Sequence, residues 1–273
     1  MSEYPFFELE KNAEDKTAVI YLNRPEKRNA MSWAFWRDLP KLVADLDKDK
    51  SVRCVIIAAR GKSFSTGLDL EGFFADRGET IKADTGDKRE ELMEMIAEMQ
   101  SGMNAIAESP KPYIAAIHKH CIGGGVDLIA ACDLRLATRD ASFSIRETKV
   151  AIVADMGSLN RLPYIIGEGN TRMMALTGRD FKAEECMRMG LLNEVHETQV
   201  GMMDSARKLA AEIAANPVMA VSGTKQILNY GLNHTQQDGL KNVVLWNTAY
   251  IDSQDLREMV DAFVNRRKPN FKE

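Results

Sequence analysis

Three short apolar runs constrain the fold of this chain more strongly than any other feature of its sequence. They are TAVIYL (17–22), CVIIAA (54–59) and YIAAI (113–117), and glycine, proline or charged residues bound each of them. Runs of this length that contain β-branched residues are typical of buried strands. The run LLNEV (191–195) is predicted to be a last strand.

Helical patterns lie between these runs. Ser32 is a suitable N-cap for a helix whose apolar stripe includes Trp36 and Leu46, although Pro40 is expected to kink or interrupt this helix. A stronger helix is predicted over 87–108, where leucine, isoleucine and methionine recur every three or four residues. Strands that alternate with helices at this spacing predict an α/β core.

Two segments fall outside this alternation. The polar segment 75–90 is predicted to be a loop, long enough to be mobile or to act as a lid. From about Thr198 the sequence is helical to its end and too polar to form a large core of its own. We expect this tail to pack on the α/β body or against another copy of the chain. Its helices are expected to break near Asn216-Pro217, Gly231-Leu232 and Ser253.

Composition excludes several classes of function. The chain has 273 residues, 45% of them hydrophobic, which is enough for one sizeable core. Its formal net charge of −4 gives no general attraction to nucleic acid or to an anionic membrane. No apolar run approaches the ~18 residues that span a bilayer. Four cysteines without paired spacing favour a reducing compartment, and the first residues lack the order of a signal peptide. We therefore expect a cytoplasmic protein.

Two glycine-containing turns are candidate sites for binding an anion. Gly67, in GKSFSTGLDL (61–70), follows a predicted strand and could turn its backbone N–H groups outward. The alternative is a plain strand-to-helix turn with Asp69 near the helix start. The run Gly123 to Gly125 is expected to open a helix, where free N–H groups meet the positive end of the dipole. A close-packed turn is the alternative, and neither nucleotide-binding glycine pattern is present.

Three acidic residues are candidates for proton transfer. Asp127 lies in the first turn of the helix after the glycine run, where the helix dipole favours its charge. Its apolar neighbours should raise its pKa, which suits proton transfer near neutral pH. Glu147 could be an exposed strand residue, and Asp155 could cap the following helix. None of the three is specific alone, and their combination carries the signal.

Five segments together resemble the enoyl-CoA hydratase/isomerase, or crotonase, superfamily, in the right order over nearly the whole α/β region. They are YLNRPEKRNAMS (21–32), SFSTGLDL (63–70), AIHKHCIGGGVDLIAACDLRLAT (116–138), IRETKVAIVADMGSLNRLPYIIG (145–167) and GLLNEV (190–195). The resemblance implies a crotonase (ClpP-like) spiral of ββα units followed by a helical trimerisation region. It divides the chain into a core with an acyl-CoA site (1–197) and an oligomerisation region (198–273), assembled as a homotrimer or a dimer of trimers.

Within this superfamily the acids look most like those of the dienoyl-CoA isomerases, which convert 3,5-dienoyl to 2,4-dienoyl thioesters. A hydratase of the family typically has glutamate in place of Asp127 and a second glutamate in place of Glu147, whereas here a third acid, Asp155, is present. The resemblance implies that Glu147 removes the C2 proton, Asp155 protonates C6 and Asp127 orients the pair. It also implies that the backbone N–H groups of Leu68 and Gly124 hold the thioester oxygen.

Coenzyme A is, on this resemblance, part of the substrate, and no separate cofactor is expected. The residues implied to bind it are Lys27, Arg28, Ala30, Thr66, Gly67, Asp69 and Leu70. Lys27 and Arg28 could instead be solvated loop charges. Basic residues of the tail, from Arg266 to Lys268, could approach the coenzyme A of a neighbouring subunit.

Two alternative functions stay open from the sequence. One is hydration of a 2-enoyl-CoA, and the other is a catalytically decayed CoA-binding oligomer. The segment HKH (118–120) precedes Cys121, but no further spaced ligand supports a metal site. Lys119 and His120 are expected at the surface or beside the acyl pocket. The C-terminal PNFKE is not the peroxisomal SKL signal, which again favours the cytoplasm.

Overall fold

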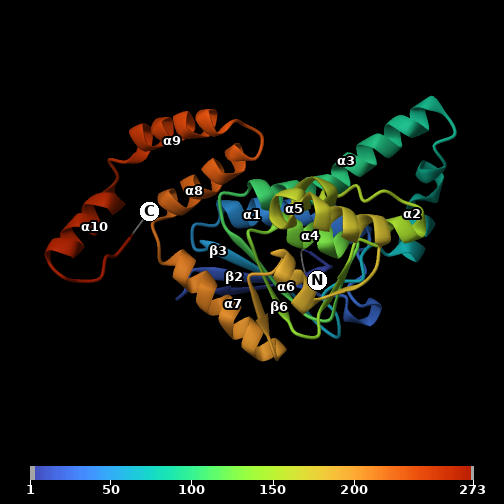
Figure 1. The fold of residues 1–273 in the computed structure, drawn as a ribbon, viewed down its shortest axis with the longest axis horizontal. Coiled ribbons are helices and arrows are strands. Elements are labelled where there is room, and N and C mark those ends of the chain that lie inside the picture. The colour runs from blue at the N-terminus through green and yellow to red at the C-terminus, as the bar shows by residue number, and fades with distance from the viewer. Residues whose placement is uncertain (1–3, 272–273) are drawn as a thin grey trace.

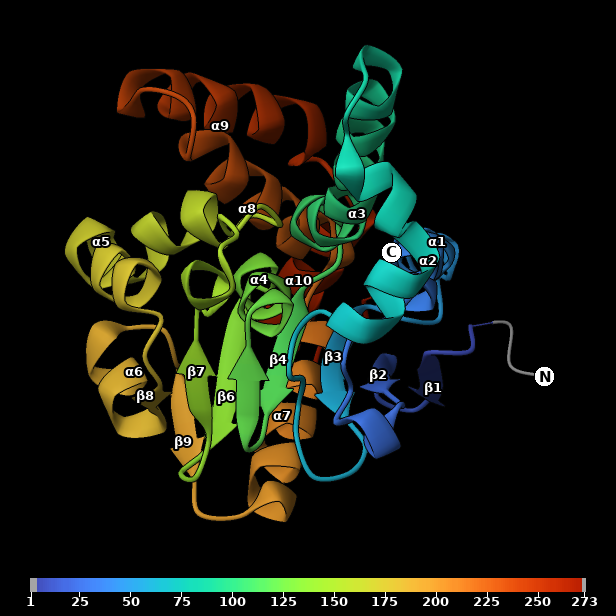
Figure 2. The same ribbon diagram turned by 90° about the vertical axis from the view of Figure 1, so that its right-hand side faces the viewer.

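A twisted six-stranded sheet forms the centre of the structure, a computed structural model that describes residues 4–271 (Figure 2). The strands, in spatial order, are β1 (Phe7–Asn12), β2 (Thr17–Leu22), β3 (Cys54–Ala59), β4 (Tyr113–Ile117), β6 (Leu134–Thr138) and β9 (Glu194–His196). β1 pairs antiparallel with β2, and the other pairs are parallel. A smaller sheet contains, in order, β5 (His120–Ile122), β7 (Ser142–Ser144) and β8 (Phe181–Lys182).

Helices cover both faces of the large sheet (Figure 1). Ile20 and Ile57 belong to the core cluster that contains residues of α1 (Trp33–Lys48), α3 (Gly86–Glu108) and α4 (Gly124–Ala131). Val19 and Ile56, which alternate with them, pack with α7 (Gln199–Ala214) on the other face. The runs 17–22, 54–59 and 113–117 are apolar throughout because both sides of these strands are buried, as in parallel sheets generally. The predicted α/β core and its three strands are confirmed.

The remaining helices complete the body and form the C-terminal tail. They are α2 (Leu70–Lys82), α5 (Ser158–Thr177), α6 (Ala183–Met189), α8 (Val218–Gly231), α9 (Gln236–Tyr250) and α10 (Gln254–Val264), with the 3₁₀ helices η1 (Pro25–Lys27) and η2 (Glu147–Val150). The helix predicted over 87–108 is α3, and the predicted breaks in the tail fall between α7, α8, α9 and α10. Within the described residues, no helix is long and apolar enough to cross a membrane.

Three predictions of local structure were wrong in whole or in part. The segment 75–90 is mostly helical rather than a loop, with only residues 83–85 between α2 and α3, because Thr85 caps α3 and the pairs Glu79–Lys82 and Asp84–Lys88 stabilise its polar turns. α1 continues through Pro40, because its buried apolar stripe outweighs the missing hydrogen bond. The last strand begins only at Glu194, after two buried leucines.

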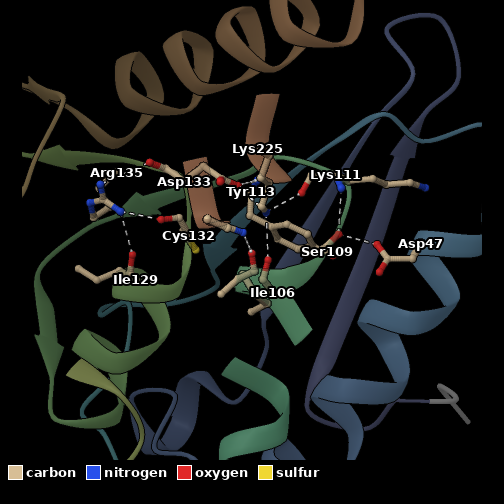
Figure 3. Close-up of polar contacts among 12 residues, drawn as sticks. Asp47, Ile106, Ser109, Lys111, Tyr113, Ile129, Cys132, Asp133, Arg135 and Lys225 are labelled. Atoms are coloured by element: carbon tan, nitrogen blue, oxygen red, sulfur yellow. Dashed lines mark hydrogen bonds and ion pairs between the residues drawn. The ribbon is translucent and has the colours of Figure 1, made fainter. Parts of the chain in front are cut away.

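The C-terminal helices α8, α9 and α10 extend away from the sheet (Figure 1). Lys225 attaches α8 to the body, since its buried ammonium donates to the backbone oxygens of Ile106 (3.1 Å) and Lys111 (3.0 Å) and to the carboxylate of Asp133 (2.9 Å) (Figure 3). α9 has no buried residue among those described. Apolar side chains stay exposed on α9 and α10, at Leu240, Val244, Leu245, Val260, Phe263 and Val264. The division of the chain at residue 198 stays a prediction.

Candidate active site

A cavity of about 170 Å³ brings the three candidate acids and both candidate N–H donors together. The N-terminus of α4, η2 and the loop before α5 contribute Gly124, Asp127, Glu147 and Asp155 to its walls, and the turn before α2 contributes Leu68. Sequence reasoning selected these residues from four separate segments, and the fold collects them at one place.

The backbone N–H of Leu68, a residue that lines this cavity, is not used in the contact with the neighbouring segment at Met31. Leu68 pairs with Met31 in a parallel bridge, in which Met31 donates to Gly67 (2.7 Å) and Asp69 donates to Met31 (3.1 Å). The bridge therefore uses the groups on either side of Leu68, and its own N–H points away from Met31. Gly124 is the first residue of α4, so its N–H has no partner within the helix. Leu68 and Gly124 both line the cavity, so a role for their N–H groups as two donors to an oxyanion stays a prediction.

Glycine is required where these two segments meet. Gly67 has φ +84°, and a Cβ atom added there would lie 2.8 Å from the carbonyl oxygen of Ile122 and 3.5 Å from the nitrogen of Gly124. A side chain would therefore be strained and would push the donors apart. Asp69, two residues on, is the N-cap of α2 and accepts from the backbone of Gly72. The strand-to-helix turn and the candidate donor site are thus features of the same segment.

Asp127 is almost completely buried, and its carboxylate is hydrogen-bonded to the start of α5. Its Oδ1 accepts a hydrogen bond of 2.7 Å from the backbone N–H of Ser158, the first residue of α5. Asp127, rather than Asp155, therefore satisfies the start of this helix, and the cap predicted for Asp155 was wrong. Burial raises the pKa of Asp127 to about 6, while the hydrogen bonds of Ser158 act in the opposite direction.

Glu147 presents a carboxylate that hydrogen bonds satisfy only in part. It begins η2 rather than lying in a strand, and a Cβ atom added at Gly123 would lie 2.9 Å from its Oε1. Its Oε2 is buried and has no hydrogen-bond partner among the described residues. Burial, followed by the nearby charge of Asp127, raises the pKa of Glu147 to about 7. Such a carboxyl can both take up and release a proton near neutral pH.

Asp155 is the most accessible of the three acids. Its neighbours Ala154 and Met156 are buried, whereas Asp155 is exposed to the cavity and to a second cavity of about 850 Å³ behind it. Burial of part of the side chain raises the pKa of Asp155 as well. The three acids thus differ in their surroundings, which is the condition for giving neighbouring carboxyls different protonation states.

The residues expected to bind coenzyme A divide into two groups. Thr66, Gly67 and Leu70 line the cavity. Lys27, Arg28, Ala30 and Asp69 lie outside its lining. The carboxylate of Asp69 forms an ion pair of 2.6 Å with Arg24, which sequence reasoning did not select. Lys27 pairs with Glu71 across 3.3 Å on the surface. Binding of coenzyme A by these residues stays a prediction.

The histidines before the glycine run lie outside the cavity lining. His118 is buried, and its Nε2 lies 3.0 Å from the backbone oxygen of Gly61. His120 is exposed and contacts Ser63, while Lys119 pairs with Asp140. Within residues 4–271 no group of three histidine, cysteine or acidic side chains could hold a metal ion.

Sequence reasoning missed most of the apolar wall of the cavity. Trp36 and Met99 were recognised as members of apolar helix stripes, but nothing in their spacing distinguishes the residue that reaches the site. Ile122 and Met156 complete this wall. An apolar wall beside three acids reduces their contact with water, most at Asp127 and least at Asp155, and burial is the first cause of each raised pKa.

Comparison with known proteins decides the family. The profile of the enoyl-CoA hydratase/isomerase family matches residues 12–273, almost the whole chain. The chain belongs to the enoyl-CoA hydratase/isomerase family. The crystal structure of enoyl-CoA hydratase from Bacillus anthracis is similar with a TM-score of 0.87 and 28% identity, covering 98% of this chain and 99% of that one. The crotonase fold inferred from the sequence is confirmed, while a trimerisation role for its C-terminal helices stays a prediction.

Among curated members of the enoyl-CoA hydratase/isomerase family, this chain is similar to two dienoyl-CoA isomerases. It is 39% identical to the mitochondrial Delta(3,5)-Delta(2,4)-dienoyl-CoA isomerase of Dictyostelium discoideum, over 100% of this chain and 93% of that protein. It is 38% identical to the peroxisomal enzyme of the same name from Arabidopsis thaliana, over 99% of this chain and 98% of that protein.

These family members contradict the predicted cytoplasmic location. The two relatives are named as mitochondrial and peroxisomal enzymes. The prediction relied on net charge, on reduced cysteines and on the absence of a recognised signal. All four cysteines are indeed free and buried, but reduced thiols indicate a reducing environment and do not distinguish one such compartment from another.

Proposed function

We propose that this protein is a dienoyl-CoA isomerase, which moves the double bonds of a 3,5-dienoyl-CoA to the 2,4 positions. The observation that carries the proposal is the meeting of three acids in one cavity that Leu68 and Gly124, the residues of the proposed N–H donors, also line. The similarity of the whole chain to enzymes named as dienoyl-CoA isomerases supports it. Coenzyme A is part of the substrate, and the proposed chemistry uses only protein groups.

The reaction proceeds by removal of one proton and addition of another. Glu147 takes a proton from C2, and the electron pair of that bond delocalises over the diene and the thioester oxygen. The N–H groups of Leu68 and Gly124 stabilise the negative charge on that oxygen. Asp155 then gives a proton to C6, and the double bonds are left at C2 and C4. No water is added, and the atoms of substrate and product are the same.

The protonation states required can be reached from the surroundings of the acids. The pair of Glu147 and Asp155 must share one proton, with the proton on Asp155 when C2 is attacked. In the free enzyme both acids have raised pKa values, and burial and the charge of Asp127 raise that of the more deeply buried Glu147 to about 7. An acyl chain that covers the accessible Asp155 excludes water from it and raises its pKa further. Substrate binding therefore moves the proton to the acid that must donate it.

Asp127 has an orienting role in this proposal. Its hydrogen bond to Ser158 fixes the start of α5, and the loop just before that helix carries Asp155. Its charge also contributes to the raised pKa of Glu147. A hydratase needs two acids to direct a water, whereas a double-bond shift that removes a proton at C2 and adds one at C6 needs a proton acceptor and a proton donor at separate carbons. The third acid, Asp155, is what favours isomerisation over hydration.

The active form is further proposed to be a homotrimer, alone or stacked as a dimer of trimers. The support is the exposed apolar surface of α9 and α10, which has nothing to cover it within one described chain. A second or third copy would remove this surface from water.

Substitution of the two proposed proton-transfer acids tests the function. Glu147→Gln and Asp155→Asn keep the shape of each side chain but cannot exchange a proton as a carboxyl does. Each is expected to lower isomerisation of a 3,5-dienoyl-CoA by at least roughly 10²-fold, which is the usual contribution of a general acid or base. An Asp155→Asn variant with wild-type isomerase activity would contradict the proposal.

A further inference from the structure

The loop that carries Asp155 has no regular secondary structure of its own. Residues 152–155 are irregular, and two bends at Met156 and Gly157 lead into α5. Gly157 has φ +112°, and a Cβ atom added there would lie 1.9 Å from Nη1 of Arg161. A segment of this kind depends on bonds from neighbouring elements to hold its backbone in one position.

Helix α3 supplies one such bond directly at Asp155. The amide Nε2 of Gln100 donates a hydrogen bond of 2.6 Å to the backbone oxygen of Asp155. Gln100 is half-buried, and it lines the second cavity rather than the one that contains Glu147. It therefore contacts the main chain of the acid and stands outside the lining of the substrate cavity.

One turn further along the same helix, a second contact supports the next residue of the loop. Asn104 accepts a hydrogen bond of 2.6 Å from Nη2 of Arg161, and Nη1 of the same guanidinium donates across 3.4 Å to the backbone oxygen of Met156. Residues four apart lie on one face of a helix, so Gln100 and Asn104 act on the loop from the same side. α3 thus holds the carbonyl of Asp155 directly and that of Met156 through Arg161 of α5.

We propose that Gln100 is a positioning residue that holds Asp155 at C6 of the substrate. The inference rests on the proposed isomerase function and adds a residue to it. Asp127 fixes the loop at the start of α5, but only Gln100, among the contacts of the described residues, holds Asp155 itself from α3. Loss of one neutral hydrogen bond changes stability by only about 1 kcal/mol. A displacement of about 1 Å at a reacting group can nevertheless lower a rate by about 10²-fold.

The variant Gln100→Met tests this role, because methionine keeps the length of the side chain and removes its donor. The control is Glu98→Met, which places a methionine at an exposed position of the same helix. Two reactions are measured in D₂O: conversion to the 2,4-dienoyl-CoA, and exchange of the C2 protons of unconverted substrate. The first needs both Glu147 and Asp155, whereas the second needs only Glu147.

Gln100→Met is expected to lower kcat for isomerisation by roughly tenfold to hundredfold, with KM changed by less than about twofold. Exchange at C2 should continue, so the ratio of exchange to isomerisation should rise, while Glu98→Met behaves as wild type. Gln100→Lys, which restores a donor, should recover much of the loss.

Several results would overturn the inference. One is an unchanged ratio of C2 exchange to isomerisation in Gln100→Met, whether both reactions are kept or both are lost equally. Another is a failure of Gln100→Lys to recover isomerisation. If the wild type converts 3,5-dienoyl-CoA and Gln100→Met matches it, only this inference fails. If the wild type converts none, the proposed function fails and the inference falls with it.

Discussion

Asp127 has two separable effects at the scale of single residues. Its carboxylate accepts the backbone N–H of Ser158, and its burial raises its pKa to about 6. The first effect stabilises the start of α5. The second means that the ionised form is costly, because the charge lies in an apolar setting next to Glu147. Asp127 thus fixes the start of α5, but its ionised form lowers the free energy of unfolding.

Substitution of Asp127 by asparagine separates these effects. An unfolded aspartate has a pKa of ~3.9, so the folded chain keeps this proton to higher pH than the unfolded chain does. The contribution of Asp127 to the free energy of unfolding is therefore fully present below about pH 4, and it is lost as the pH rises through about 6. Asp127→Asn keeps an acceptor oxygen and should gain about 2–3 kcal/mol over the wild type between about pH 4 and about pH 8. Urea denaturation of both proteins at the two pH values measures this, and an equal difference at both would refute it.

The proton shared by Glu147 and Asp155 predicts the pH dependence of catalysis. The pKa of Glu147 is about 7, so the free pair loses its last proton as the pH rises through this value. We therefore expect kcat/KM for isomerisation to fall above about pH 7, approaching tenfold per pH unit. A pH–rate profile that keeps rising to about pH 9 would show that no such proton is needed.

At the scale of elements, the site depends on how closely two turns approach each other. Gly67, in the turn before α2, lies against Ile122 and Gly124 at the start of α4. This contact sets the distance between the two free N–H groups. The backbone there leaves no room for a side chain, and the positive φ of Gly67 adds a conformational reason for glycine.

Gly67→Ala should therefore lower kcat by about 10²–10³-fold, as expected when one donor of an oxyanion site is displaced. Gly78→Ala is the matched control. A Cβ atom at Gly78, inside α2, meets nothing within 4 Å, so this variant should be as active as the wild type and slightly more stable. Steady-state kinetics and thermal unfolding of both variants check the prediction. Equal activity of the two variants would remove the proposed role of Leu68.

The strands and the residues of the site were predictable from sequence for different reasons. The runs at 17–22 and 54–59 were recognisable because strands buried on both faces need apolar residues throughout. The acids were selected by resemblance, since Glu147 in isolation looks like an exposed strand residue. Neither route could find Gln100, whose role depends on a contact across 55 residues of sequence. Composition likewise could not reveal that the polar segment 75–90 is helical, because its stability comes from caps and ion pairs.

At the scale of the whole molecule, the tail is bonded to the body at α8 and again at Phe271, whose backbone oxygen accepts from Arg53 (3.4 Å), while apolar side chains between them stay exposed. Lys225 links α8 to the end of α3 and to Asp133 (Figure 3). Beyond it, Leu245 and Phe263 are 69% and 77% exposed. A single chain leaves this surface in water, which is unfavourable by about 25 cal/mol per Å² of apolar area.

A charge on this surface should therefore disrupt the proposed trimer. Leu245→Asp is expected to give monomers, whereas Leu176→Asp, at a leucine on α5 that is 72% exposed, should leave the assembly intact. Light scattering coupled to size-exclusion chromatography measures the mass of each. A monomeric wild type, or a Leu245→Asp variant that remains assembled, would argue against assembly through α9.

Assay of the purified wild type on two thioesters tests the proposed isomerase function most directly. Incubation with a 3,5-dienoyl-CoA, followed by absorbance and mass spectrometry, should give a conjugated 2,4-dienoyl-CoA of unchanged mass, while crotonyl-CoA gains little or no water. A protein that adds the mass of one water to crotonyl-CoA and leaves the 3,5-dienoyl-CoA unconverted would be a hydratase, which would contradict the proposed double-bond shift by Glu147 and Asp155.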